Sequence, residues 1–313
     1  MHRTFLILVF VALILAGLLH CTTNNEYSTV IPSGLLILIP DDSHIELVAA
    51  EFQFAEGPVW HKDGYLLFSD IPADTIYKLK PDQKIVVFRN PSGNSNGLTF
   101  DNHGRLIICE HGNRRVTRLE KDGKLTVLAS HYGSKRLNSP NDVVVKSDGS
   151  VYFTDPPYGV DVKDRDLDFQ GVYRISPDGK LVLLVKDFAM PNGLAFSPDE
   201  KVLYIADSSE RMHIRAFQVL RDGTLANSRI FAELRTEKKG APDGLKVDSL
   251  GNLWVAGPGG VWVFNKNGEH LGTLKFPEIP ANCAWGDRDG KTLYVTARTG
   301  LYRIRTSVRG VKP

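Results

Sequence analysis

The sequence has few cysteines and no concentrated stretch of positive charge, and these shortages exclude several kinds of protein. Three cysteines among 313 residues are too few for a small scaffold held together by disulfides. The formal net charge is +2, and no run of basic residues is longer than Arg114-Arg115. Binding to nucleic-acid phosphates requires a dense basic face, so we expect no nucleic-acid partner.

Long hydrophobic runs are also missing, apart from one at the N-terminus. The apolar segment Phe5 to Leu19 follows His2-Arg3, and a polar stretch begins just after Cys21. This length suits the core of a signal peptide and is short for a membrane-spanning helix. We therefore expect a leader over residues 1–21, a polar tether over 22–44 and a single domain over 45–313.

The end of this leader, Leu18-Leu19-His20-Cys21, resembles the cleavage box of a bacterial lipoprotein. Lipidation of Cys21 would make this protein a periplasmic or cell-envelope lipoprotein, whose only membrane contact is the lipid anchor. His20 departs from the pattern, because a small residue normally precedes the cysteine. Simple secretion and an uncleaved anchor stay open as alternatives, and all three predict an exported protein. The sequence carries no signal for an oligomeric state.

Two cysteines remain after the leader, and each lies within an apolar run typical of a strand. Cys109 ends Leu106-Ile107-Ile108-Cys109, and Cys283 lies in Asn282-Cys283-Ala284-Trp285. We expect two buried, unpaired thiols rather than a disulfide, and a catalytic role for neither.

A short phrase recurs along the chain, and this repeat predicts the fold. Each copy begins with an acid or an amide, continues into apolar residues and lies 39 to 51 residues from the next. The six copies begin at Glu56, Asn96, Asn141, Asn192, Asp243 and Asn282.

Each phrase is followed by a turn, such as Lys62-Asp63-Gly64, and then by further β-rich runs. Short alternating runs separated by Asx-Gly turns are typical of antiparallel hairpins. Four strands in each repeat of about 45 residues form a blade of a β-propeller. The last repeat has room for only three strands, and the run Ile45-Glu46-Leu47-Val48-Ala49 stands before the first. The sequence therefore predicts an all-β, six-bladed propeller with four-stranded blades, closed when this N-terminal strand pairs with the last blade.

The six phrase-initial residues occupy equivalent positions, so we expect them to meet near one mouth of the central channel. Two carboxylates brought together repel each other unless a cation or a proton compensates them. Two acids among several amides match the hard oxygen ligands of Ca²⁺, and the absence of His and Cys here disfavours Zn²⁺. At any single position the alternative is that Asn and Asp simply form turns, but this explains Glu56 less well.

A second set of acids lies fourteen or fifteen residues after the phrase starts, where a hairpin brings the chain back to the same edge. We expect each to be a cross-strand neighbour of its phrase start. Hydrogen bonds to loop amides are the favoured role for Asp70 and Asp207. For Glu110, which precedes His111, and for Asp155, which precedes Pro156-Pro157-Tyr158-Gly159, a place in the substrate pocket is equally open.

Several of these segments together resemble the gluconolactonase and regucalcin (senescence marker protein) superfamily of calcium-dependent six-bladed propellers. The resemblance covers about residues 45 to 305. It rests on Ala55-Glu56-Gly57-Pro58-Val59-Trp60, Glu110-His111-Gly112-Asn113-Arg114-Arg115, Ser139-Pro140-Asn141-Asp142, Thr154-Asp155-Pro156-Pro157-Tyr158-Gly159, Pro191-Asn192-Gly193-Leu194 and Pro242-Asp243-Gly244-Leu245.

The resemblance implies that one divalent cation is held by Glu56, Asn141, Asn192 and Asp243. Ca²⁺ is the expected ion, and Mg²⁺, Mn²⁺ or Zn²⁺ can occupy such oxygen sites. A sugar lactone such as gluconolactone is then the expected substrate, with the ion as Lewis acid and Asp243 as general base. Asp155 or His111 is the alternative base. We expect Asn96, Glu110, His111, Asp155 and Tyr158 to contact the substrate.

Two other functions stay open on the same scaffold. The first is hydrolysis of a phosphotriester or an aryl ester, with the same ion holding a phosphoryl or carbonyl oxygen. The second is a non-catalytic exported propeller that binds a partner, in which the ion only stabilises the channel.

Overall fold

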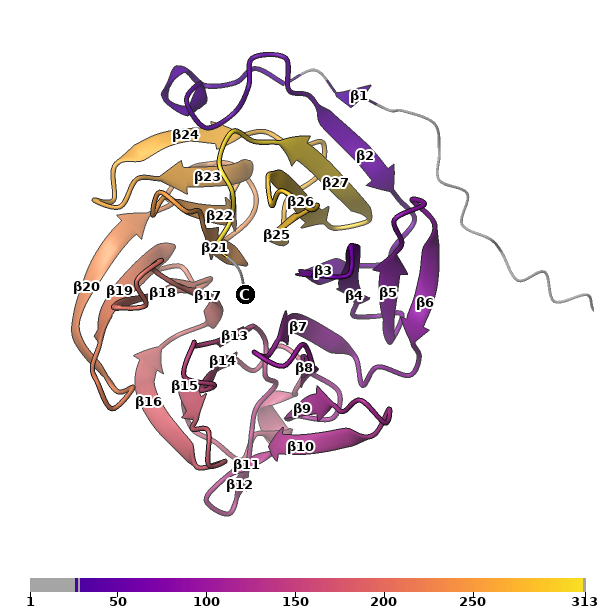
Figure 1. Ribbon diagram of the computed structural model, residues 1–313. Helices are drawn as coiled ribbons and strands as arrows, with labels where there is room; N and C mark the ends of the chain where they lie inside the picture. The colour runs from indigo at the N-terminus through magenta and orange to yellow at the C-terminus, as the bar shows by residue number, and fades with distance from the viewer. Residues whose placement is uncertain (1–25, 28, 312–313) are drawn as a thin grey trace, which may run out of the picture.

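Six antiparallel sheets surround a central axis, each with the strand of its repeated phrase innermost (Figure 1). The structure, a computed structural model, describes residues 26–27 and 29–311. The ring confirms the predicted six-bladed β-propeller. The predicted leader and Cys21 lie outside the described residues.

The first three blades have four strands each. Blade one contains β3 (Ala55–His61), β4 (Tyr65–Asp70), β5 (Thr75–Leu79) and β6 (Ile85–Arg89). Blade two contains β7 (Ser95–Phe100), β8 (Leu106–Glu110), β9 (Arg115–Leu119) and β10 (Leu125–Ala129). Blade three contains β13 (Val143–Val145), β14 (Val151–Asp155), β15 (Gln170–Ile175) and β16 (Leu181–Phe188). A hairpin of β11 (His131–Tyr132) and β12 (Lys135–Arg136) separates blades two and three.

The last three blades complete the ring. Blade four contains β17 (Pro191–Phe196), β18 (Val202–Asp207), β19 (His213–Val219) and β20 (Leu225–Glu233). Blade five contains β21 (Leu245–Val247), β22 (Leu253–Gly257), β23 (Gly260–Phe264) and β24 (His270–Leu274). Blade six contains β25 (Asn282–Gly286), β26 (Thr292–Ala297) and β27 (Gly300–Arg305) from the C-terminal part of the chain.

The ring closes where the N-terminal strand β2 (Ile45–Ala49) pairs antiparallel with β27, as the sequence predicts. The short strand β1 (Glu26–Tyr27) then pairs with β2. Arg303 on β27 donates to the Glu46 carboxylate at 2.7 and 2.9 Å, which adds a charged contact to this junction. This pairing covers the outer edge of β27, which would otherwise be an unpaired strand edge.

The segment before β2 differs from the expected polar tether. Its short 3₁₀ helix η1 (Ser33–Leu35) leads into a turn, and Leu35, Leu38 and Ile39 are buried with the core residues of blades five and six. This stretch packs on the ring because its apolar side chains have a hydrophobic surface to cover. Over residues 26–27 and 29–311, no helix is long and apolar enough to span a membrane.

The core lies between neighbouring blades, where the faces of adjacent sheets pack together. Trp254 of blade five meets Trp285 of blade six edge to face, with ring centroids 5.3 Å apart. Cys109 and Cys283 are buried in two of these inter-blade clusters and form no disulfide, as predicted. Burial raises the pKa of both thiols, which keeps them protonated and inert.

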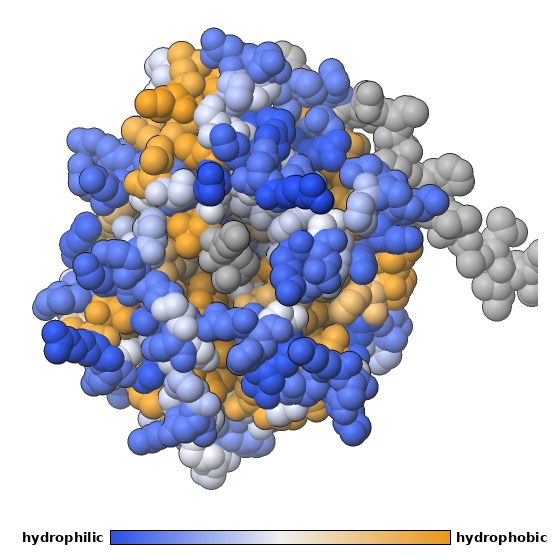
Figure 2. All heavy atoms as spheres, in the orientation of Figure 1, coloured by the Kyte–Doolittle hydropathy of each residue, from blue (hydrophilic) through white to orange (hydrophobic). Residues whose placement is uncertain are grey.

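One end of the channel forms a cavity of about 330 Å³, lined mainly by apolar side chains of the inner strands. The C-terminal segment reaches this cavity: Val311 lines it, and the Val311 amide donates to the Val247 carbonyl at 3.0 Å. Figure 2 shows hydrophobic residues between hydrophilic ones toward the middle of this view. None of the six phrase-initial residues lines the cavity, so they lie toward the other end of the channel.

Candidate functional site

Three of the six inner strands begin with backbone irregularities that allow neighbouring phrases to pack closely. Register shifts occur between Glu56 and Val59 in β3, and at equivalent places in β7 and β17. Gly57 has a φ of +52°, and a Cβ on it would lie 2.0 Å from the Asn96 carbonyl oxygen of the next blade. Only glycine fits both requirements. This close approach gathers the phrase-initial residues around the axis.

Glu56 and Asp243 are the two carboxylates of this ring, and each affects the other. Burial raises the pKa of Glu56 to about 7, and the charge of Asp142 contributes in the same direction. Burial and the charge of Glu56 raise the pKa of Asp243 well above its usual range. The two side chains therefore lie close together although they come from blades one and five. Without a cation, the site favours uptake of a proton by this pair.

The side-chain amide of Asn192 lies beside Asp243. Its Nδ2 donates to Ser208 Oγ at 2.9 Å, and Asp243 also hydrogen-bonds to the Asn192 side chain. The Asn141 side chain is buried, and its backbone amide is fixed by the Thr154 carbonyl at 2.8 Å. The Glu56 and Asp243 carboxylates and the Asn192 amide thus come together from blades one, five and four. Asn141 is buried at the equivalent position at the start of blade three.

The other two phrase-initial amides are engaged with neighbouring side chains. Asn282 hydrogen-bonds to Glu56, and its Oδ1 accepts from the Cys283 amide at 2.8 Å. Asn96 Nδ2 lies 3.2 Å from His111 Nε2. Asn282 therefore supports Glu56, and Asn96 orients His111.

His111 and Tyr158 lie beside this ring. Burial lowers the pKa of His111 to about 4, so the imidazole is neutral at pH 7. Tyr158 is 47% exposed, and its hydroxyl hydrogen-bonds to Ser208 and Asn192. Burial and the charge of Asp243 raise the pKa of Tyr158 to about 12. Tyr158 thus reaches the Asn192–Asp243 side of the site from the open face.

The second set of acids lies one residue away from the predicted register. Asp70, Glu110 and Asp207 pair with Ala55, Ser95 and Pro191, the residues that precede the phrase starts. The bulges cause this shift, which the repeat spacing does not reveal. Because side chains alternate along a strand and cross-strand pairs share a face, these acids project away from the phrase-initial side chains.

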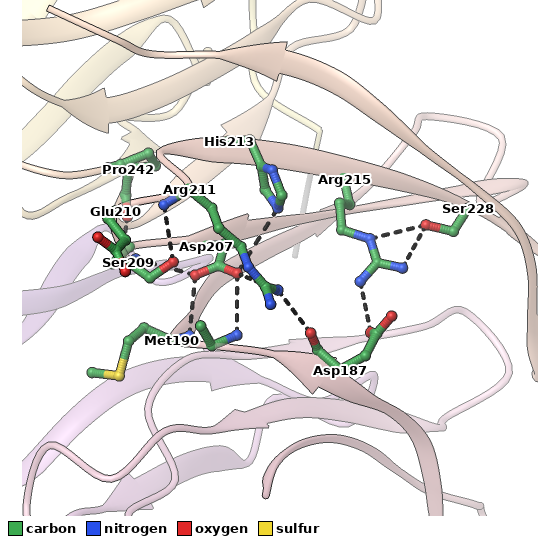
Figure 3. A network of polar contacts seen from close by, with 12 residues as sticks. Asp187, Met190, Asp207, Ser209, Glu210, Arg211, His213, Arg215, Ser228 and Pro242 are labelled. Atoms are coloured by element: carbon green, nitrogen blue, oxygen red, sulfur yellow. Dashed lines mark hydrogen bonds and ion pairs between the residues drawn. The ribbon is translucent and has the colours of Figure 1, made fainter.

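Asp70 and Asp207 bind loop backbone, as expected. Asp70 accepts hydrogen bonds from the amides of Gln53 and Phe54 at 2.9 and 3.0 Å. Figure 3 shows Asp207 in the same role, accepting from Met190 and Ser209 amides, both at 3.1 Å. These bonds lower the pKa of Asp207, so its carboxylate stays ionised.

Glu110 and Asp155 are also used in local structure. Glu110 is buried and accepts from Thr117 Oγ1, Asn113 Nδ2 and Arg115 Nε at 2.6 to 2.8 Å. Asp155 is fully buried, and its Oδ2 accepts from the Asn138 amide at 2.8 Å. Burial raises the pKa of Asp155 to about 7. The contacts of both acids fix the loops that carry His111 and Tyr158. The two acids therefore affect the phrase-initial residues only by positioning these loops.

Two charged residues near the ring are absent from the sequence-based set. Asp142 is buried and follows Asn141, at the position where four other phrases have glycine. Lys246 follows Asp243 by three residues and extends toward Asp142, with Nζ to Oδ2 at 4.0 Å. An alignment of the six phrases contains both signals: one acid among glycines and one lysine among uncharged residues.

No group of three or more His, Cys, Asp or Glu side chains within residues 26–27 and 29–311 is arranged to hold a metal ion. The four expected ligands, Glu56, Asn141, Asn192 and Asp243, differ from such a group because two of them are amides. Hard cations accept carbonyl and carboxylate oxygens alike. The chemistry of this donor set therefore fits a divalent cation that prefers oxygen.

Comparison with known proteins identifies the family. A family model described as "SMP-30/Gluconolactonase/LRE-like region" matches residues 54–299. The chain belongs to this family. The matched region contains all the residues of the ring, and it confirms the predicted kinship.

Relatives in the SMP-30/gluconolactonase family share both sequence and fold with this chain. A gluconolactonase from Zymomonas mobilis is 36% identical over 85% of this chain and 82% of its own length. The solved structure of a gluconolactonase from Xanthomonas campestris is 33% identical, with a TM-score of 0.83 over 92% of this chain and 98% of that one. A calcium-binding regucalcin from Agrobacterium tumefaciens is 20% identical with a TM-score of 0.71, covers 85% of this chain and 94% of its own, and shares the fold.

Proposed function

We propose that this protein opens a sugar lactone such as gluconolactone, with a divalent cation held by Glu56, Asn141, Asn192 and Asp243. Its class as a lactonase is confirmed by the gluconolactonase relatives, which are 33% and 36% identical to it over most of its length. The single observation that carries the metal part is the pair of carboxylates Glu56 and Asp243, which lie beside the Asn192 amide and both have raised pKa values.

The arrangement of the ring supports a cation such as Ca²⁺. Two carboxylates with raised pKa values gain most from a bound positive charge, and the Asn192 amide lies beside one of them, Asp243. The relative from Agrobacterium is itself described as calcium-binding. A bound divalent cation would polarise the lactone carbonyl and stabilise the charge that develops on its oxygen.

Asp243 is our candidate for the general base. Among the four proposed ligands it alone is partly exposed, whereas Glu56, Asn141 and Asn192 are buried. It can therefore reach a water molecule at the mouth. His111 is neutral but its Nε2 faces Asn96, and Asp155 is fully buried with an oxygen committed to Asn138. These contacts make both less suited than Asp243 to take up a proton from water.

Substrate contacts are proposed on the same face. The aromatic side chain of Tyr158 is partly exposed, and its hydroxyl lies beside Asn192, which suits a residue that covers a bound sugar. Asn96 and His111 belong to blade two, whereas Asn192 belongs to blade four, so Asn141 of blade three stands between them in the order of the blades. Glu110 and Asp155 would not touch the substrate but would position the loops that carry His111 and Tyr158.

A panel of substrates tests the proposal. Hydrolysis of gluconolactone, an aryl ester and a phosphotriester is compared in excess EDTA and after addition of Ca²⁺, Mg²⁺, Mn²⁺ or Zn²⁺. We expect cation-dependent turnover that is fastest for the lactone. Lactone turnover undiminished by EDTA would contradict the metal part. Faster turnover of the phosphotriester or ester would favour that alternative, and no turnover of any substrate would favour a binding protein.

Export is proposed as well, on the basis of the hydrophobic run and Cys21 in the N-terminal sequence. Metabolic labelling with a radioactive fatty acid should mark the wild-type protein, and Cys21→Ser should remove the label. Unlabelled wild-type protein in the cell envelope would contradict lipidation, and retention of the full-length chain in the cytoplasm would contradict export.

A further inference from the structure

The fourth residue of each phrase lines the channel cavity, and only one of the six is charged. This position follows the phrase start by three residues, which places it farther along the inner strand. Its six occupants are Val59, Thr99, Val144, Ala195, Lys246 and Trp285. Lys246 belongs to β21, and its side chain is 28% exposed. A lone ammonium among apolar side chains needs nearby oxygens to offset its lost hydration.

The ammonium of Lys246 finds these oxygens on the side of the channel where the carboxylates lie. Its Nζ donates to the Leu245 carbonyl at 3.1 Å and lies 3.5 Å from Asn282 Oδ1. Asn282 in turn hydrogen-bonds to Glu56. The lysine thus lies between the apolar cavity and the ring proposed to hold a cation.

Asp142 is the acidic partner of Lys246 in this part of the channel. Its Oδ1 accepts from the Val143 amide at 2.9 Å, whereas its buried Oδ2 has no hydrogen-bond partner within the part of the chain that the structure describes. Lys246 Nζ lies 4.0 Å from that oxygen. At this distance the attraction across a partly buried site is substantial.

Charge counting connects these residues to the ring. Glu56, Asp142 and Asp243 act on one another electrostatically, and Lys246 is the cation that acts on Glu56. When all three carboxylates are ionised, they and the ammonium have a net charge of −2, which one divalent cation neutralises. We propose that Lys246 is a built-in counter-ion of this cluster, which compensates Asp142 and leaves Glu56 and Asp243 to be neutralised by a single divalent cation. This inference rests on the proposed cation site.

The proposal predicts that loss of the ammonium has opposite effects in the two states of the site. Without a bound cation, Lys246→Met leaves three neighbouring carboxylates uncompensated, so the variant should unfold more easily than wild type. With a cation, the variant loses a repulsive neighbour and keeps all four proposed ligands, so it should bind Ca²⁺ about tenfold more tightly. Simple loss of packing would not strengthen ion binding.

The experiment uses the purified full-length protein at a mildly alkaline pH. Urea unfolding in excess EDTA measures stability without the ion, and calorimetric titration with Ca²⁺ measures affinity and stoichiometry. Lys246→Met is compared with the double variant Lys246→Met/Asp142→Asn, which restores the cluster charge to −2. Lys201→Met is the matched control, because that lysine is 79% exposed and pairs only with Asp199 among the ion pairs of the described chain.

We expect one ion per wild-type chain, a less stable and tighter-binding Lys246→Met, and a double variant that returns toward wild type in both measurements. Lys246→Met that binds Ca²⁺ no more tightly than wild type, or a double variant no more stable in EDTA than Lys246→Met, would overturn the counter-ion. A wild-type chain that binds no divalent ion would instead contradict the proposed function, and the comparison in EDTA would still decide whether Lys246 compensates Asp142.

Discussion

The propeller contains two sets of acids that differ in the number of hydrogen-bond donors around them. One set is Asp70 and Asp207, at the ends of second strands, and the other is Glu56 and Asp243, at phrase starts. Asp70 accepts hydrogen bonds from two backbone amides, and Asp207 accepts them from three. Glu56 accepts the Gly57 amide and an Asn282 contact, yet burial and a neighbouring acid still raise its pKa to about 7. Carboxylates with enough donors stabilise the fold, whereas carboxylates short of donors are available for a cation.

The largest expected effect is the loss of catalysis in the donor-poor set. Asp243→Asn and Glu56→Gln keep the shape of the side chains but remove a charge from the ring. We expect each to lower kcat for gluconolactone by about 10²–10⁴-fold and to weaken Ca²⁺ binding. Steady-state kinetics and calorimetric titration check both effects, with circular dichroism to verify folding. Wild-type turnover in either variant would remove the distinction between the two sets.

The donor-rich set should respond in stability instead. Asp207→Ala leaves the loop amides of Ala189, Met190 and Ser209 without their acceptor. We expect the free energy of unfolding to fall by about 2–4 kcal/mol, with kcat of the folded protein within about threefold of wild type. Urea unfolding measures the change in free energy, and steady-state kinetics at urea concentrations below the unfolding transition measure kcat. A loss of turnover without a loss of stability would place Asp207 with the first set.

The pH dependence of stability sharpens the comparison through His111. Its pKa is about 4 in the folded protein and about 6.5 when unfolded, so the unfolded chain binds more protons between these values. Stability from the neutral imidazole is fully present above pH 6.5 and is lost as the pH falls toward 4. We expect a contribution of about 1–3 kcal/mol, which His111→Gln should remove. Urea unfolding across this range should show a shallower slope in the variant, and an unchanged slope would exclude this role.

The smallest effect is expected at Tyr158. Removal of its hydroxyl in Tyr158→Phe leaves the ring that covers the site and breaks the contact with Ser208 and Asn192. We expect KM for the lactone to rise about three- to tenfold with little change in kcat, as one hydrogen bond is lost. Tyr158→Ala should raise KM further. Equal kinetics in all three proteins would exclude Tyr158 from the substrate pocket.

The repeat in the sequence predicts most of the fold because each phrase and turn recurs in every blade. Pairing of residues 45–49 with the last blade is also predicted, since a three-stranded final repeat needs a partner. Burial of Leu35, Leu38 and Ile39 is not, because a short apolar run outside the repeat has no pattern that indicates its contacts. The polar residues around it suggest a tether instead.

The proposed ligand residues follow from the same symmetry, but the details around them do not. The one-residue shift of Asp70, Glu110 and Asp207 comes from bulges, which depend on backbone geometry. Asp142 and Lys246 are each an exception at a position that is otherwise glycine or uncharged. Their significance emerges only when the closed ring brings blades three and five to the same axis, because neither is near the other in sequence.

Closure of the ring has a consequence for the order in which this chain matures. β2 can pair only after β27, near the end of the chain, has been synthesised. Glu56 follows β2 on blade one, and Asp243 lies on blade five, so the final blade fixes their separation. A nascent chain that lacks residues 300–305 therefore has every proposed ligand but no fixed distance between the two acids. Ring closure and the ability to capture an ion should appear together, as the last step of folding.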